Sequence, residues 1–314
     1  MTSDITGLHH MSALAGTAAG NLRFYTRTLG LRLVKRTVNF DAPGSWHLYY
    51  GDRTGRPGSL VTFFPHPGYR AGVPGAGEVA ITHLAAGPGS LAFWQDRLAA
   101  AGVEVARQSA GGKDRLRFRD PDGTRLTLAE ADAAATDPAP AADVPAEKAI
   151  LGLSAVTIVV SQLDPTAAFL TDTLGFKPLG QAGNRAWFEP TGVPLVNAVG
   201  RQSIEVVADA NAPRPVLGVG SVHHVAWRVP DDAAQARVRA LVEGKVTGLT
   251  ETKDRSYFRS IYFREPGGTI FEVATDGPGF PVDEPVESLG TTLKLPPQFE
   301  PRRHEIEAIL PPLT

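Results

Sequence analysis

Two short apolar stretches each carry a pair of adjacent histidines, His9 and His10 in GLHHMSALA and His223 and His224 in SVHHVAWRV. The chain has only eight histidines, so these pairs contain half of them. A third apolar stretch, TIFEVA, contains Glu272, and carboxylates in such surroundings are rare unless they are paired or bind a metal. Because the chain has no cysteine, histidine and carboxylate would have to bind any metal ion.

The alternation of side chains along a strand selects the candidate ligands. Successive residues point to opposite faces, so only one histidine of each pair can enter a given site. We expect the second members, His10 and His224, to lie inside together with Glu272. Two histidines and one carboxylate are typical of non-haem Fe(II) oxygenases, which leave positions open for substrate and dioxygen. Mn(II) fits the same ligands, and histidines that are simply buried in the core are the alternative.

The elements that would position these residues form a repeat. A segment rich in alanine and proline, residues 132–148, is the predicted linker. We expect two β-α-β-β-β units in residues 1–131, two more in residues 149–280, and a C-terminal tail in residues 281–314. Each unit has one helical segment: AAGNLRFYTRTLG, SLAFWQDRLAAAG, DPTAAFLTDTLG and DDAAQARVRALVEG. The second strand of the fourth unit is predicted in KVTGLTE. Four units of one order predict an α+β fold.

An alignment of the units shows which of them carry ligands. It sets each candidate against a residue of another unit: His10 against Ala155, His224 against His83, and Glu272 against Thr127. If the first unit pairs with the fourth, one cup receives all three ligands, and the cup of the second and third units receives only His83. Pairing the first unit with the second would separate His10 from the other two ligands. The ligands therefore favour the first arrangement.

The unit order resembles the vicinal-oxygen-chelate superfamily, whose members pair such units into cup-shaped half-barrels. Further segments resemble the ring-cleaving hydroquinone dioxygenases, such as 2,6-dichlorohydroquinone dioxygenase: GLHHMS, VKRTVNFD, WHLYYGD, DRSYFRSIYFREPGGTIFE and the tail ESLGTTLKLPPQFEPRRHEIE. This resemblance spans both halves and the tail. It implies an Fe(II)-dependent, extradiol-type dioxygenase that opens the ring of a hydroquinone or related dihydroxybenzene and inserts both atoms of O2.

The resemblance also assigns residues. It implies iron ligands at His10, His224 and Glu272, surrounded by His9, His223, Arg255 and Tyr262. One of the two outer histidines would exchange a proton with the substrate, and the sequence does not choose between them. Arg255 would stabilise negative charge that develops on oxygen, and Tyr262 would form a hydrogen bond to the coordinated hydroxyl. The family commonly has threonine at the position of Ser12.

Two other classes of function remain open. A metal-dependent, glyoxalase-like lyase or isomerase of this superfamily would be expected to have four protein ligands, and Ala155 and Thr127 cannot complete such a set. A non-catalytic small-molecule-binding protein of the same fold would lack the metal ligands. Oxygen consumption separates the dioxygenase from both alternatives.

Composition restricts the partners. The net charge of −2 gives no electrostatic footprint for nucleic acid. No apolar run approaches the length of a membrane span, and no secretion signal is evident, so a cytoplasmic location is expected. The expected ligands are a small aromatic substrate and O2. The proline-rich tail would pack on the second half of its own chain or on a neighbour in a homo-oligomer.

Overall fold

The computed structural model describes residues 3–110, 112–132, 137–193 and 199–313. Residues 133–136, which belong to the predicted linker, lie outside this described part. The next part of the predicted linker contains the short 3-10 helix η2 (Ala146–Lys148).

Each unit has the predicted order of strand, helix and three strands. The first comprises β1 (Gly7–Ala15), α1 (Ala18–Arg23) with its π-helical continuation η1 (Phe24–Thr28), β2 (Arg32–Asn39), β3 (Ala42–Gly51) and β4 (Leu60–Pro65). The second comprises β5 (Glu78–Ala86), α2 (Leu91–Ala100), β6 (Ala106–Ala110), β7 (Lys113–Arg119) and β8 (Arg125–Glu130). The third comprises β9 (Ile150–Val160), α3 (Leu163–Ala168) with η3 (Phe169–Thr173), β10 (Lys177–Ala182), β11 (Arg185–Glu189) and β12 (Ser203–Ala208). The fourth comprises β13 (Val222–Val229), α4 (Asp232–Val242), β14 (Lys253–Asp254), β15 (Arg259–Arg264) and β16 (Ile270–Thr275).

Local sequence explains where the helices begin and end. The side chain of Thr17 accepts a hydrogen bond from the amide of Gly20 and so caps α1, and Asp231 caps α4 in the same way. In the first and third units the helix ends in a π-helical turn, followed after one further residue by a glycine with positive φ, Gly30 and Gly175. The same irregular ending in two units supports the repeat seen in the sequence.

The second strand of the fourth unit was predicted in the wrong place. The segment KVTGLTE forms only an isolated bridge between Thr247 and Arg264, and the regular strand β14 begins later, at Lys253. Gly248 adopts a positive φ of 67° between them, which bends the backbone out of an extended conformation. The β-branched residues of this segment are typical of a strand, but the conformation of Gly248 prevents a regular strand from forming there.

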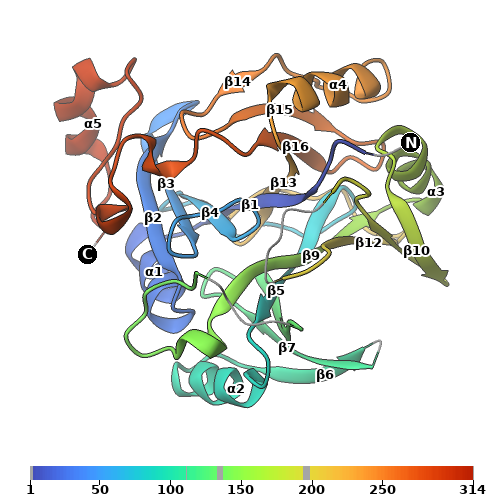
Figure 1. The fold of residues 1–314 in the computed structure, drawn as a ribbon, viewed down its shortest axis with the longest axis horizontal. Helices are drawn as coiled ribbons and strands as arrows, with labels where there is room; N and C mark the ends of the chain where they lie inside the picture. Colours follow the sequence, from blue (N-terminus) through green and yellow to red (C-terminus); the bar gives the residue numbers. More distant parts are fainter. Residues whose placement is uncertain (1–2, 111, 133–136, 194–198, 314) are drawn as a thin grey trace.

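The strands pair as the distribution of the ligands predicted. β1 runs antiparallel to β13, so the first and fourth units share one cup, and β5 runs antiparallel to β9, so the second and third share the other. The first cup has the strand order β2-β3-β4-β1-β13-β16-β15-β14. A short contact between Val222 and Val79 joins the cups into one sheet. Figure 1 shows the helices on the outside, with α4 at the top, α2 at the bottom and α3 at one side.

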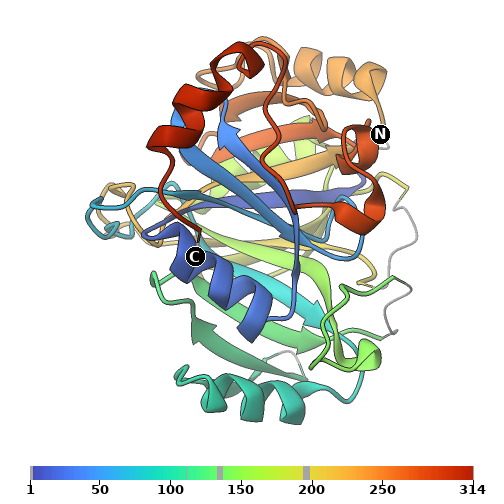
Figure 2. The ribbon, with the colours of Figure 1, turned by 90° about the vertical axis from the view of Figure 1, so that its left-hand side faces the viewer.

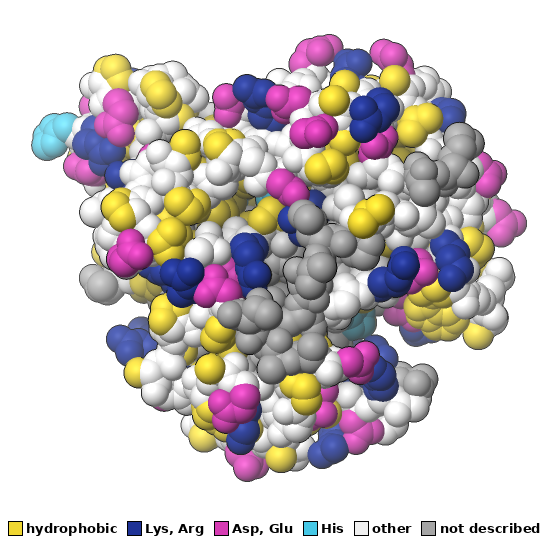
Figure 3. Space-filling model, in the orientation of Figure 1, with side chains coloured by type: hydrophobic (Ala, Val, Ile, Leu, Met, Phe, Trp, Pro, Cys, Tyr) yellow, Lys and Arg dark blue, Asp and Glu magenta, His cyan; other side chains and the backbone are white. Residues whose placement is uncertain are grey.

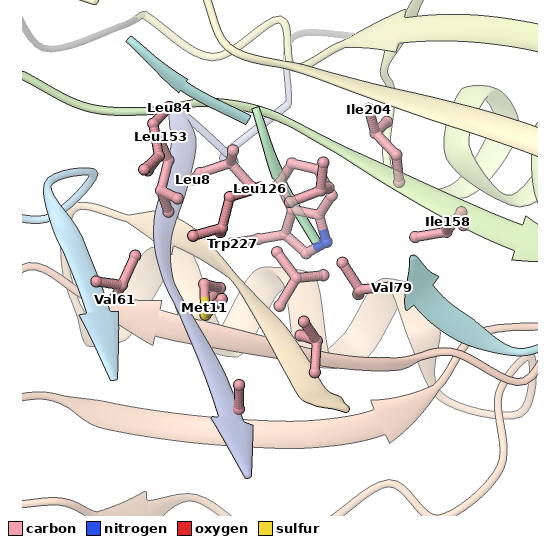
Figure 4. Close-up of a cluster of buried hydrophobic side chains, with 14 of the residues drawn as sticks. Leu8, Met11, Val61, Val79, Leu84, Leu126, Leu153, Ile158, Ile204 and Trp227 are labelled. Carbon is pink, nitrogen blue, oxygen red and sulfur yellow. The ribbon is translucent and has the colours of Figure 1, made fainter. Parts of the chain in front are cut away.

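The core that holds the cups together lies where their central strands meet. Trp227 of β13 is fully buried, and its neighbours in the close-up come from both cups, including Met11, Val79 and Ile158 (Figure 4). Burial of such side chains contributes roughly 1.5–3 kcal/mol each. The two central strands that carry the paired histidines are therefore among the most firmly packed elements of the protein.

The C-terminal tail contains η4 (Phe280–Val282), η5 (Val286–Ser288), η6 (Glu300–Arg302) and α5 (Arg303–Ile309). It crosses the strands of the first unit, as Figure 2 shows with the red segment over the blue strands. Ile306 and Leu295 pack against Val38 of β2, and the indole nitrogen of Trp46 donates a hydrogen bond to the carbonyl of Pro311 over 2.7 Å. The tail therefore packs on both halves of its own chain: Leu295 and Ile306 lie against β2 of the first unit, and Asp283 accepts from Tyr257 of the fourth unit.

The surface carries both charges in mixed positions. Over the face shown in Figure 3, the Lys and Arg side chains alternate with Asp and Glu side chains. None of the described helices has the length and apolar character needed to cross a membrane.

Candidate metal centre

The three predicted ligands meet at the centre of the first cup. His10 lies on β1, His224 on β13 and Glu272 on β16, which are adjacent strands. Glu272 Oε2 lies 3.2 Å from His10 Nε2 and 2.9 Å from His224 Nε2, and the two Nε2 atoms are 3.4 Å apart. All three side chains are buried. They form a group whose donor atoms lie close enough together for a single metal ion.

One oxygen of the Glu272 carboxylate accepts a hydrogen bond, and the other points toward the two histidines. Ser260 Oγ donates a hydrogen bond to Glu272 Oε1, whereas the buried Oε2 makes no regular hydrogen bond with any described residue. Burial alone would raise the pKa of Glu272, but the neighbouring His10 and His224 hold this pKa well below its ordinary value. A buried, ionised oxygen without a hydrogen bond is costly unless a cation lies beside it. The donor set therefore fits a divalent metal ion.

A hydrogen-bonded series fixes the tautomer of His10. His9 Nε2 lies 3.2 Å from the carbonyl oxygen of Thr275, which can only accept, so this nitrogen carries the proton. Burial lowers the pKa of His9 well below its usual value, so its ring is neutral and Nδ1 is an acceptor. The 2.9 Å contact between the Nδ1 atoms of His9 and His10 then requires the proton on His10. His10 Nε2 is left with a free lone pair directed at the site, as metal ligation requires.

His223 has the same relation to His224 but a different environment. Their Nδ1 atoms are 2.8 Å apart, and burial lowers the pKa of His223 to about 3. If His224 donates through Nδ1 and keeps Nε2 for a metal, neutral His223 carries its proton on Nε2. His223 lines the cavity at the site, whereas His9 does not contribute to the described cavity wall. Of the two outer histidines, only His223 is placed to contact a substrate.

Arg255 and Tyr262 form the next polar group. Arg255 Nε donates to Tyr262 Oη over 3.1 Å, and Arg255 Nη2 binds Asp41 at 2.9 Å. Tyr262 pairs directly with Glu272 across β15 and β16, so both side chains lie on one face of the sheet. Burial raises the pKa of Tyr262 well above its usual value, which keeps the phenol protonated. Tyr262 Oη accepts from Arg255, and Ser260, which also binds Glu272, lies within hydrogen-bonding reach of the same hydroxyl.

These groups border one cavity of about 450 Å³. Its wall includes His10, Leu14, Asp41, His47, Tyr49, Phe64, His223, His224, Arg255, Phe258 and Tyr262. The volume and the mixture of aromatic and polar walls suit a small aromatic molecule. No role was assigned to His47, Tyr49 or Ser260 from the sequence. The alternation in WHLYYGD and the serine inside the apolar run RSIYF were the available signals.

Among the residues that the structure describes, the second cup holds no equivalent set of ligands. His83 lies opposite Ala155 and beside Thr127, whereas the residue opposite His10 and beside Glu272 is Ala226. The register therefore places His83 at the position of Ala226, two residues from the position of His224 with which the sequence alignment matched it. The two ring nitrogens of His83 bind the hydroxyls of Thr127 and Thr157 at 2.7 and 2.8 Å.

The buried His83 should make the stability of the protein depend on pH. Burial lowers the pKa of His83 from 6.5 to about 4. Between these values the unfolded chain binds a proton that the folded protein does not, so stability is lost as the pH falls from 6.5 through 4. The loss attributable to His83 is about 3 kcal/mol. In urea unfolding of metal-free protein at pH 7 and pH 4.5, the His83→Gln variant should lose less stability than the parent. Equal losses in the two proteins would contradict this role.

The paired β-α-β-β-β units place the chain in a known family. The model of the Glyoxalase/Bleomycin resistance protein/Dioxygenase superfamily matches residues 7–128 and 152–273, and the chain belongs to this family. Maize glyoxalase I shares the fold, with a TM-score of 0.60 at 16% identity over 86% of this chain and 92% of that one.

Relatives with higher sequence identity to this chain belong to a more specific group within the family. The chain is 38% identical to the "Putative ring-cleaving dioxygenase MhqO" of Bacillus subtilis over 99% of this chain and 98% of the relative. It is 35% identical to the chlorohydroquinone/hydroquinone 1,2-dioxygenase of Sphingobium indicum, over 96% and 95% of the two chains. A crystal structure of a "putative dioxygenase" from Bacillus subtilis superposes with a TM-score of 0.93 at 38% identity, covering 100% of this chain and 99% of that one.

Proposed function

We propose that this protein is a ring-cleaving dioxygenase that binds Fe(II) through His10, His224 and Glu272 and opens the ring of a hydroquinone or related dihydroxybenzene. The observation that carries the proposal is the buried cluster of the three side chains beside a cavity large enough for one ring. The similarity to ring-cleaving dioxygenases over nearly the whole chain supports it.

The ligand set supports iron and also fits Mn(II). Two histidines and one carboxylate leave coordination positions for a substrate oxygen and O2, so that a bound Fe(II) would acidify the phenol and bring the two reactants together. The extradiol-type outcome, cleavage between a hydroxylated carbon and its neighbour with insertion of both oxygen atoms, belongs to this proposal. A lyase of the same family is less well supported, because the first cup supplies three ligands.

Four residues near the ligands would bind the substrate, stabilise charge on it or orient a ligand. Tyr262, whose oxygen accepts from Arg255, would donate a hydrogen bond to the substrate oxygen at the site. The positive charge of Arg255 would stabilise negative charge that develops there. His223, with its proton on Nε2, would donate a hydrogen bond into the cavity. His9 would act on the substrate only through the orientation of His10.

The aromatic side chains would hold the ring and limit water. Phe258 packs against His10 with ring centroids 5.2 Å apart, and Phe64 lies on another part of the cavity wall. An apolar ring between such walls is bound without loss of hydrogen bonds, while its hydroxyl groups would be directed to polar neighbours.

The proposal is tested by oxygen uptake. Protein loaded anaerobically with Fe(II) is mixed with aerated buffer containing hydroquinone, chlorohydroquinone or catechol. We expect O2 consumption with formation of a ring-opened product, and none in the His224→Ala variant. Tight metal binding without O2 consumption on any ring would favour a lyase or isomerase, and the absence of metal binding would remove the basis of the proposal.

A separate variant tests the role of Tyr262. Replacement by phenylalanine removes the donor to the substrate oxygen while the carbon skeleton stays in place, so kcat/KM for hydroquinone should fall about 10- to 100-fold. Metal content should stay the same, because Tyr262 is not among the ligands. An unchanged kcat/KM in a fully metal-loaded Tyr262→Phe variant would show that this hydroxyl does not act on the substrate.

A further inference from the structure

A second polar group borders the cavity on the far side of the ligands from Tyr262. His47 and Tyr49 lie on β3, which is separated from β1 by the single strand β4. Tyr262 lies on β15, which is next to β16 on the opposite side of the ligand strands. Both edges of this curved sheet line the same cavity. A ligand on the metal therefore lies between Tyr262 and the wall formed by β3.

His47 and Tyr49 belong to a hydrogen-bonded chain of four side chains. Tyr49 Oη lies 2.9 Å from His47 Nδ1, and His47 Nε2 lies 2.9 Å from Thr62 Oγ1. Thr62 Oγ1 in turn lies 2.7 Å from Ser12 Oγ. Ser12 is buried on β1, two residues after His10 and directly opposite His224. The chain thus runs from the ligand strand to the cavity wall and ends at a phenol.

This chain can run in either direction without movement of a heavy atom. Burial lowers the pKa of His47 well below its usual value, so the ring is neutral and has one donor and one acceptor nitrogen. If Thr62 donates to Nε2, then Nδ1 donates to Tyr49, whose own proton is free for a ligand. If Tyr49 donates to Nδ1 instead, its oxygen can accept from a ligand. Tyr49 can therefore match a hydroxyl group either as donor or as acceptor.

Aromatic rings surround Tyr49 on several sides, and Tyr262 and Arg255 lie near enough to influence the pKa of its phenol. The ring of His47 packs between Tyr49 and Phe64, with centroids 4.0 and 4.1 Å away, and Phe258 lies 6.4 Å from the ring of Tyr49. Tyr49 itself is only 3% exposed. A polar ligand atom that reaches this wall loses its water, so one hydrogen bond there has a large effect on selectivity.

We propose that Tyr49, supported by His47, Thr62 and Ser12, binds the substrate hydroxyl that is not on the metal, and that it selects hydroquinones over catechols and monophenols. This inference rests on the proposed function for the identity of the metal-bound oxygen. A hydroquinone with one oxygen on the metal directs the other away from it, toward a wall such as that of β3. A catechol that binds the metal through both oxygens leaves none for Tyr49, and phenol has no second oxygen.

The test is a binding measurement without oxygen, so that no turnover is needed. Calorimetric titrations of anaerobic, Fe(II)-loaded protein with hydroquinone, phenol and catechol give three dissociation constants for each protein. We expect the parent to bind hydroquinone about tenfold more tightly than phenol, and the Tyr49→Phe variant to bind the two equally. Catechol affinity should change less than twofold. The matched control is Tyr50→Phe on the same strand, whose hydroxyl binds Asn21 outside the cavity, and it should keep the preference.

The outcomes separate this inference from the proposed function. A Tyr49→Phe variant that still prefers hydroquinone overturns the inference, whatever the enzyme does with O2. If that variant does not fold, equal affinities of the parent for hydroquinone and phenol overturn it as well. If the preference depends on Tyr49 but no ring is opened when O2 is admitted, the binding role stands and the dioxygenase proposal fails.

Discussion

Replacement of Glu272 by glutamine is expected to abolish activity, with a loss of at least about a thousandfold in turnover of hydroquinone. The amide keeps the size of the side chain and can still accept from Ser260, but it lacks the charge directed at His10 and His224. Without that charge the three donors no longer balance a divalent cation. Metal content, measured after gel filtration, should fall from about one ion per chain to near zero.

Thermal unfolding provides a readout of the same variant that does not depend on activity. Addition of Fe(II) or Mn(II) at about a hundred times its dissociation constant should stabilise the parent by about 2.7 kcal/mol and leave Glu272→Gln unchanged. The matched control is Glu205→Gln in the second cup, where the carboxylate accepts from Thr157 and Arg185. A Glu272→Gln variant that retains metal and activity would show that the ligands have been assigned incorrectly.

The second large effect concerns stability. Replacement of Lys35 by methionine should lower the free energy of unfolding by about 3–5 kcal/mol. Lys35 on β2 is completely buried, and its ammonium group pairs with Asp283 and Glu284 of the tail and binds the carbonyl of Phe280 at 3.3 Å. Methionine fills the space but leaves the buried Glu284 without its cation. Urea unfolding measures the loss directly.

This ion cluster also connects the tail to the cavity. Tyr257 donates to Asp283 and stacks on Phe280, and the next residue, Phe258, lines the cavity. The double variant Lys35→Met/Glu284→Gln should recover part of the stability, because no unpaired carboxylate remains buried. The control Arg303→Met breaks more exposed ion pairs of α5 and should cost less than about 1 kcal/mol. A loss below this limit for Lys35→Met would contradict the anchoring role.

The cluster of His10, His224 and Glu272 could be predicted from the sequence because two independent regularities agree. Alternation along a strand selects one histidine of each pair, and the repeat places His10 and His224 in one cup with Glu272. Both regularities are local properties of the chain. They do not depend on the details of packing, so the distances between the ligand atoms follow once the units pair.

The features that could not be predicted from the sequence depend on strand register and on contacts between residues far apart in the chain. The alignment of His83 with His224 differs by two residues from the strand register, because a shift of two residues keeps every side chain on the same face of a strand and leaves the apolar pattern unchanged. The choice between His9 and His223 required knowing which of the two rings borders the cavity. Likewise, Tyr49 gains a role only through the chain that Thr62 and Ser12 complete.

The measurement that tests the central claim most directly follows the fate of molecular oxygen. Fe(II)-loaded protein is given hydroquinone under ¹⁸O2, the product is reduced immediately with borohydride to prevent exchange with water, and its mass is determined. Ring cleavage by a dioxygenase predicts that both labelled atoms of one O2 appear in a ring-opened product. Benzoquinone without label, or an isomerised product formed without O2 consumption, would contradict the account.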